Sequence, residues 1–81
     1  MKSIFAPSIP PRDRHKQIFD LFFSLAVGEQ MMLINDHDPK PLHYTFLIEY
    51  PDTFTWVYQT EGPELFEVVI TKILDVTPKT K

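Results

Sequence analysis

The sequence contains no cysteine, which excludes several kinds of chemistry at once. Without a thiol, the chain forms no disulfide, holds no metal through thiolate ligands and has no sulfur nucleophile. It has only two glycines among its 81 residues, so it lacks the glycine-rich loop that cradles phosphate groups in nucleotide-binding proteins. Enzyme classes that depend on a reactive cysteine or on such a loop are therefore excluded.

Long apolar runs and an excess of positive charge are also missing. No apolar run approaches the roughly 18 residues that a membrane span requires. Pro7, Pro10 and Pro11 interrupt the N-terminal segment, so it lacks the apolar region of a signal peptide. The formal net charge of −3 argues against a broad phosphate-binding surface, which needs clustered lysines and arginines. We therefore expect a cytoplasmic protein that binds neither membranes nor nucleic acids.

Large apolar side chains are plentiful. Hydrophobic residues make up 43% of the chain and aromatic residues 14%, which is enough for one small hydrophobic core. The end of the chain, from residue 76 to residue 81, is polar and predicts a frayed tail. We therefore expect a single domain over residues 1–75.

The first half of the chain alternates between extended and helical patterns. Residues 3–6 form a short apolar run that predicts a strand. From Pro11 to about Ala26, apolar residues recur at spacings of three and four, which is typical of a helix with one buried face. Gly28 suits the C-cap of this helix. Residues 29–35 are apolar on both sides, which predicts a strand in the interior of a sheet.

Residues 42–50 fit both a helix and a strand, because both periodicities occur there. The preceding residues favour a helix. Asp38 is a good N-cap residue, and Pro39 and Pro41 suit a first helical turn, where a missing N–H group costs little. Pro51 then ends the element. We therefore predict a second helix.

The last third of the chain predicts a β-hairpin. Residues 53–59 alternate, and Phe54, Trp56 and Tyr58 form an aromatic face that we expect to meet the helices. Residues 65–73 are rich in β-branched side chains and follow a turn. The predicted class is α/β (α+β): a two-layer sandwich with the order β-α-β-α-β-β, in which two helices cover one face of a four-stranded mixed sheet.

The chain resembles the small bacterial proteins called domain of unknown function 2249. Three motifs carry this resemblance: PPRDRH, GEQMMLINDHDPKPL and EGPELFEV. That family is itself similar in fold to the TusA/SirA-like sulfur carriers, and its members occur joined to or encoded near hemerythrin-like, iron-binding domains. The resemblance thus implies a TusA/SirA-like domain and a hemerythrin-like or other redox protein as a partner.

The resemblance does not extend to sulfur transfer. The sulfur carriers place a Cys-Pro-x-Pro motif at the start of the first helix, and the corresponding stretch here runs from Ile9 to Asp13. Pro10 stands where the cysteine would be. Without a thiol there is no persulfide chemistry, so the chain can share the scaffold but not this activity.

The segment NDHDPKPLHY is the first candidate site. His37 and His43 are six residues apart, and Asp36 and Asp38 flank His37. Imidazole and carboxylate are common ligands of divalent iron and zinc, which makes the segment a candidate metal site. One alternative is structural: Asn35 and the aspartates form a turn after the strand, and Asp38 caps the next helix. Another is recognition of a partner or a small anion by this polar rim. We favour the structural alternative, which leaves Asp36 and His37 as the residues least explained by folding.

The motif PPRDRH adds three further candidates. Arg12 and Arg14 are expected to be solvated or paired with Asp13, with anion binding near the first helix as the alternative. His15 borders the buried face of the helix, so we expect a packing role, with a third metal ligand as the alternative. The predicted topology does not require the start of this helix and the end of the second strand to share an edge.

The residues give little support for catalysis, because no serine lies in a recognisable nucleophile context. We favour a non-catalytic protein-interaction or accessory module that uses both polar segments, in the redox or iron context that the family resemblance implies. The second hypothesis is a metal- or small-ligand-binding domain that uses His15, His37 and His43 with Asp36 or Asp38. The third is a weak enzyme built on the same residues, with an Asp–His pair as acid and base.

Overall fold

The computed structural model describes residues 1–76. Its elements are β1 (Lys2–Phe5), the short 3₁₀ helix η1 (Ala6–Ser8), α1 (Pro11–Ser24), β2 (Gln30–Asn35), α2 (Lys40–Glu49), β3 (Phe54–Glu61) and β4 (Phe66–Lys72). This confirms the predicted order β-α-β-α-β-β, including the helix over residues 42–50. The predicted polar tail falls almost wholly outside the described residues.

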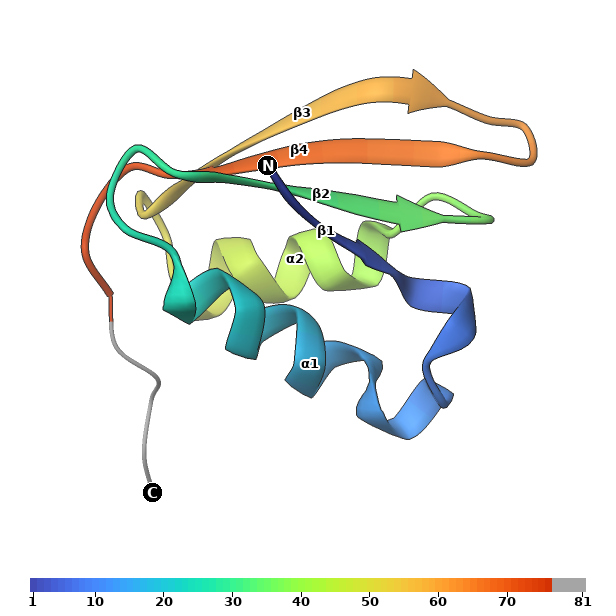
Figure 1. Ribbon diagram of the computed structural model, residues 1–81, viewed down its shortest axis with the longest axis horizontal. Helices are drawn as coiled ribbons and strands as arrows, with labels where there is room; N and C mark the ends of the chain where they lie inside the picture. The colour runs from blue at the N-terminus through green and yellow to red at the C-terminus, as the bar shows by residue number, and fades with distance from the viewer. Residues whose placement is uncertain (77–81) are drawn as a thin grey trace.

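The four strands form one mixed sheet in the order β1-β2-β4-β3. β1 and β2 are parallel, whereas β4 runs antiparallel to both β2 and β3. Both helices lie on the same face of this sheet (Figure 1). Because β1 and β2 are parallel, their carboxyl ends share one edge, and α1 and α2 both begin at that edge (right in Figure 1). The topology therefore brings together the two segments that carry the candidate polar residues.

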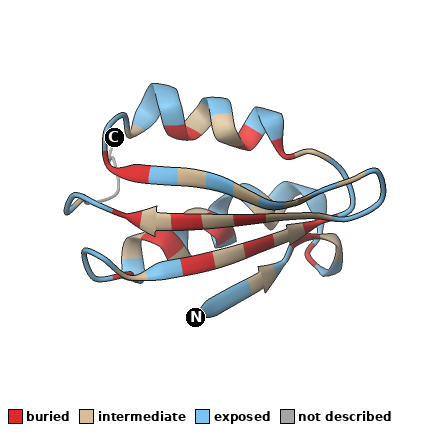
Figure 2. Ribbon diagram, turned by 90° about the horizontal axis from the view of Figure 1, so that it is seen from above, coloured by how far each residue is buried: buried red, intermediate tan, exposed pale blue. Residues whose placement is uncertain are grey.

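The core lies between the sheet and the two helices. Buried side chains alternate with more exposed ones along the strands, as the two-residue period of a strand with one covered face requires (Figure 2). β3 follows the prediction, since Phe54 is buried and Trp56 contacts the ring of Phe46 on α2. The innermost apolar residues, at most 3% exposed, are Ala6, Ile18, Phe22, Leu25, Met31, Leu33, Leu42, Phe46, Val68 and Ile70.

The ends of the first strand and the first helix differ from the prediction. Ala6 already belongs to η1 and is not part of β1. α1 ends at Ser24, and its C-cap residue is Leu25, so the predicted C-cap at Gly28 was wrong. Gly28 instead has a positive φ of 91° in the turn that follows, and its N–H group donates to the carbonyl of Lys72 at 2.6 Å. A bond to a strand that lies far away in the sequence therefore decides the position of this turn.

The start of α2 also differs from the prediction. Its N-cap residue is Pro39, and no side chain caps the helix. The predicted capping role of Asp38 was therefore wrong. The Asp38 carboxylate instead accepts a hydrogen bond of 2.6 Å from the hydroxyl of Tyr58 on β3. This long-range bond fixes the entry to α2 against the sheet.

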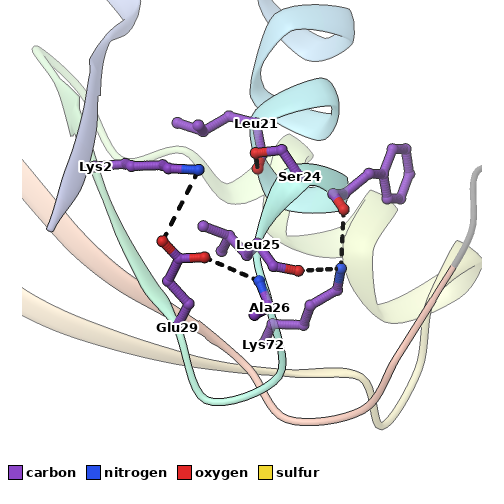
Figure 3. A network of polar contacts seen from close by, with 8 residues as sticks. Lys2, Leu21, Ser24, Leu25, Ala26, Glu29 and Lys72 are labelled. Atoms are coloured by element: carbon purple, nitrogen blue, oxygen red, sulfur yellow. Dashed lines mark hydrogen bonds and ion pairs between the residues drawn. The ribbon is translucent and has the colours of Figure 1, made fainter.

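A buried lysine closes the opposite end of α1 (Figure 3). Lys72 is 1% exposed, and its Nζ donates to the carbonyls of Phe23 at 3.0 Å and Leu25 at 2.7 Å. The last carbonyls of a helix lack partners within the helix, so the ammonium group both satisfies them and meets the negative end of the helix dipole. Beside it, Glu29 accepts the N–H group of Ala26 at 2.9 Å. Neither helix in the described part of the chain has the length and hydropathy to span a bilayer.

Candidate functional site

A pocket of about 160 Å³ lies where α1 and α2 begin and β2 ends. Its walls come from both polar segments singled out in the sequence. The first segment supplies Arg14 and His15, and the second supplies Asn35 and His37. The structure thus joins two segments whose convergence the predicted topology did not require.

The floor of the pocket is apolar. It consists of Ala6 from η1, Ile18 from α1, Leu33 from β2 and Leu42 from α2. Leu33 is fully buried and the other three are at most 3% exposed, so these side chains belong to the core as well. A ligand that enters the pocket therefore meets hydrocarbon at its inner end.

Arg14 is the fixed charged group of the pocket. Its Nε–H group donates to the carbonyls of Ala6 at 2.9 Å and Ile9 at 2.8 Å, which ties η1 to the first turns of α1. Within residues 1–76, no protein group accepts a hydrogen bond from its two terminal amino groups. Arg14 does not pair with Asp13, as one part of the expectation had it; its Nε–H group is held by backbone carbonyls at the pocket wall. Its terminal donors remain available to a ligand.

His37 lies at the mouth of the pocket in contact with Asp36. The His37 Nδ1 atom is 2.7 Å from Asp36 Oδ1, and the two side chains are 63% and 67% exposed. This hydrogen bond holds the pKa of the Asp36 carboxyl below its ordinary value, and the charges of His37 and Arg14 act in the same direction. When Nδ1 carries the shared proton, Nε2 is the ring atom open to a ligand.

The remaining candidates of the first segment differ in position. His15 is exposed and lines the pocket, so it is not the packing residue that we expected. Arg12 is exposed and does not line the pocket. Two arginines of one motif thus have different roles, because they lie two residues apart and so point to different sides of α1.

His43 and Asp38 lie outside the pocket lining. The ring of His43 stacks on Trp56 with a centroid distance of 4.2 Å and an interplanar angle of 1°. Asp38 is engaged by Tyr58, as described above. Among residues 1–76, no three side chains of the types that commonly bind metals converge on one point. The arrangement of His15, His37 and His43 therefore gives no support to a metal site built from the three imidazoles.

The stacked position of His43 predicts a pH dependence of stability. Burial lowers the pKa of His43 below the ordinary value of 6.5, and the nearby Asp38 carboxylate opposes this effect only in part. Below about pH 6.5, His43 is therefore protonated more readily in the unfolded chain than in the folded one. The neutral, stacked His43 contributes its full stabilisation above pH 6.5, and this stabilisation is lost as the pH falls through the lowered pKa.

We expect the free energy of unfolding, measured with urea between about pH 7 and about pH 5, to fall more steeply in the wild type than in His43→Phe. Phenylalanine keeps an aromatic ring over Trp56 but removes the titrating group. Equal slopes in the two proteins would contradict this explanation.

Sequence patterns singled out several polar members of the site but missed its shape. Arg14, His15 and His37 were candidates, whereas the contribution of Asn35 to a pocket wall and the whole apolar floor were not predicted. Asn35 is 7% exposed, and its Oδ1 accepts the N–H group of Asp36 at 2.9 Å, so the expected turn role is also present. No local pattern could have indicated this shape, because it depends on the parallel pairing of β1 and β2, whose carboxyl ends are a common place for ligands to bind.

Comparison with known proteins adds a family but no activity. No curated protein and no solved structure matches the chain. Residues 6–72 match the family described as "Uncharacterized conserved protein (DUF2249)", and this span includes every residue that lines the pocket. The chain therefore belongs to the DUF2249 family.

Proposed function

We propose that the protein is a non-catalytic binding module that holds a small anionic group in the pocket between α1, α2 and the end of β2. The observation that carries this proposal is the state of Arg14. Two backbone carbonyls fix its Nε–H group, while the terminal amino groups have no acceptor within residues 1–76. A guanidinium held in this way loses little conformational freedom when an anion binds, which favours affinity.

The charges around the pocket also support an anion. No carboxylate is among the described residues that line the pocket. Asp36 lies nearby, but its carboxylate already accepts the hydrogen bond from His37. A carboxylate or a similar anionic group of a ligand would therefore accept charge-assisted hydrogen bonds from the terminal amino groups of Arg14.

The same lining argues against a catalytic role. The described wall residues include no serine, threonine, tyrosine, lysine or cysteine that could act as a nucleophile. Asp36 orients His37, but the pair has no nucleophile beside it to activate. The residues that line the pocket can bind a ligand without any added nucleophile or cofactor.

The biological setting of this binding is a separate proposal. The element order supports a scaffold shared with the TusA/SirA-like sulfur carriers, and the absence of cysteine excludes their persulfide chemistry. A hemerythrin-like or other redox protein as a partner rests on the family resemblance alone. A protein of this kind would have to present an anionic group to the pocket.

A titration monitored by NMR tests the proposed function. We expect that acetate, benzoate, sulfate or phosphate shifts the amide signals of residues 6–15 and 33–42 in the wild type. Arg14→Gln should weaken this binding by about 10-fold or more, because a hydrogen bond to a charged group contributes about 1.5–3 kcal/mol.

Arg12→Gln is the matched control for this titration. It removes the same charge from an exposed position in the same turn of the helix, outside the pocket lining. Its affinity should stay within about 2-fold of the wild type, as expected for a solvent-screened charge. The proposal is wrong if none of the four anions perturbs these residues, or if the two variants lose affinity equally.

A further inference from the structure

We propose that the anion recognised by this pocket is a carboxylate on a compact hydrocarbon body about the size of a benzene ring, either a free acid or the C-terminal residue of a peptide. This inference rests on the proposed function and specifies its ligand. It follows from the volume of the pocket, the chemistry of its walls and the geometry of Arg14.

The volume determines the size of the hydrocarbon body. The pocket has a volume of about 160 Å³ and is partly open to solvent, and a closed cavity of about 150 Å³ lined by Leu, Ile and Phe side chains holds a benzene ring. Acetate would fill only a small part of this space and would leave the rest to water. A ring or a branched chain of four or five carbons would fill the space and bury apolar surface on both sides.

The walls favour a carboxylate over a phosphate. Phosphate sites are commonly built from backbone N–H groups or from several cationic side chains. Three of the wall residues here, Pro11, Pro39 and Pro41, have no N–H group. No lysine is among the described wall residues, and Arg14 is their single arginine. One planar guanidinium matches the two oxygens of one carboxylate.

The neighbouring charge favours a ligand with a single negative charge. Asp36 lies between the wall residues Asn35 and His37 in the chain, and its Oδ1 is 2.7 Å from His37 Nδ1, so its carboxylate lies beside the pocket. A dianionic phosphate would therefore be repelled more strongly by Asp36 than a carboxylate would. With Arg14 on the half-buried wall and Leu33 on the buried floor, the carboxylate would lie toward solvent and the hydrocarbon body toward the core.

The test compares five probes by NMR titration of the full chain: benzoate, 3-methylbutanoate, acetate, inorganic phosphate and benzamide. We expect benzoate and 3-methylbutanoate to bind at least about 10-fold more tightly than acetate and phosphate, because they add the buried hydrocarbon. Benzamide, which has the ring but no charge, should bind at least about 10-fold more weakly than benzoate.

Two peptide probes distinguish the two sources of the carboxylate. They are acetyl-alanyl-leucine and the same dipeptide with a C-terminal amide. Tighter binding of the free-acid dipeptide than of 3-methylbutanoate, together with loss of binding by the amide, identifies the C-terminus of a chain as the source. Tighter binding of 3-methylbutanoate identifies a free acid.

Arg14→Lys separates the shape of the guanidinium from its charge. It keeps the positive charge and should weaken benzoate binding by about 10-fold, because the benzoate carboxylate forms two parallel hydrogen bonds with the planar guanidinium. The weak binding of phosphate should stay nearly unchanged. Arg12→Lys is the matched control and should behave as the wild type. Amide spectra of both variants should match the wild type outside residues 6–15 and 33–42, which shows that the fold is intact.

The outcomes separate this inference from the proposed function. If acetate or phosphate binds the pocket as tightly as benzoate, the inferred ligand is wrong although the anion pocket stands. If benzamide binds as tightly as benzoate, the carboxylate plays no part and the inference is also wrong. If none of the anions perturbs the pocket residues, both proposals fail together.

Discussion

Replacing Phe46 with alanine lowers the free energy of unfolding by about 4 kcal/mol, the effect expected when a large buried ring leaves a cavity. Phe46 on α2 is completely buried. Its ring centroid lies 4.5 Å from that of Phe19, 5.0 Å from that of Phe22 and 4.9 Å from that of Phe54. The ring therefore contacts residues of both α1 and the sheet.

The size of this loss is large for so small a domain. Domains of this length have a stability of about 5 kcal/mol, so Phe46→Ala should be largely unfolded near 40 °C. Ile48→Ala is the control, because Ile48 lies on the same helix but is 73% exposed, and its effect should stay within about 0.5 kcal/mol. Chemical denaturation followed by circular dichroism measures both. Similar losses in the two variants would show that α2 does not pack against the sheet through Phe46.

Replacing Lys72 with methionine lowers the free energy of unfolding by about 3 kcal/mol, since two carbonyls at the end of α1 lose a charged donor. The methionine keeps an unbranched apolar stem of similar length, so the change reports mainly on the two hydrogen bonds to Phe23 and Leu25. The ring of Phe22, with its centroid 5.6 Å from Nζ, loses a cation as well.

The direction of the change in stability for Lys72→Met shows whether the hydrogen bonds of the buried ammonium group outweigh its desolvation cost. Removing a buried charge also removes its desolvation cost, and in some proteins that gain outweighs the lost contacts. Here the carbonyls would be left without a partner, so we expect the loss to dominate. Lys16→Met is the control, because Lys16 is an exposed residue paired with Asp20 at 2.8 Å, and its effect should be much smaller than that of Lys72→Met. A Lys72→Met protein as stable as the wild type would contradict this role.

Local sequence patterns were sufficient for the fold. The spacing of apolar residues in α1, the alternation in β3 and the prolines before α2 each predict the element that forms, because each signal acts within a few residues. Even the ambiguous segment 42–50 was resolved correctly by Pro39 and Pro41. Only the capping argument failed, because the expected cap, Asp38, accepts a hydrogen bond from Tyr58 instead.

The errors have a common physical cause. Asp38 and Tyr58 are 20 residues apart, and Lys72 and Leu25 are 47 residues apart. Helix capping rules treat the local chain alone, so they miss a side chain or a backbone group that finds a better partner across the fold. A lysine at the end of a strand is ordinarily exposed, and nothing in its neighbours indicates that Lys72 is buried.

Some polar residues of the candidate site were predictable, but its chemistry was not. His37 and Arg14 were singled out because polar side chains cluster in two short motifs. Whether they converge depends on the parallel pairing of β1 with β2, which a single sequence does not specify. His43 belongs to the same motif as His37, yet its ring stacks on Trp56. The three imidazoles therefore suggested a metal, whereas the position of Arg14 supports an anion.

The most direct test of the account is a crystal structure of the protein with benzoate. We predict one benzoate in the pocket, with its carboxylate oxygens at about 2.7–2.9 Å from the terminal nitrogens of Arg14. Its ring should contact Leu33 and Leu42 on the floor. A benzoate bound at any other place, or one whose carboxylate points away from Arg14, would contradict the claim that this pocket is the binding site.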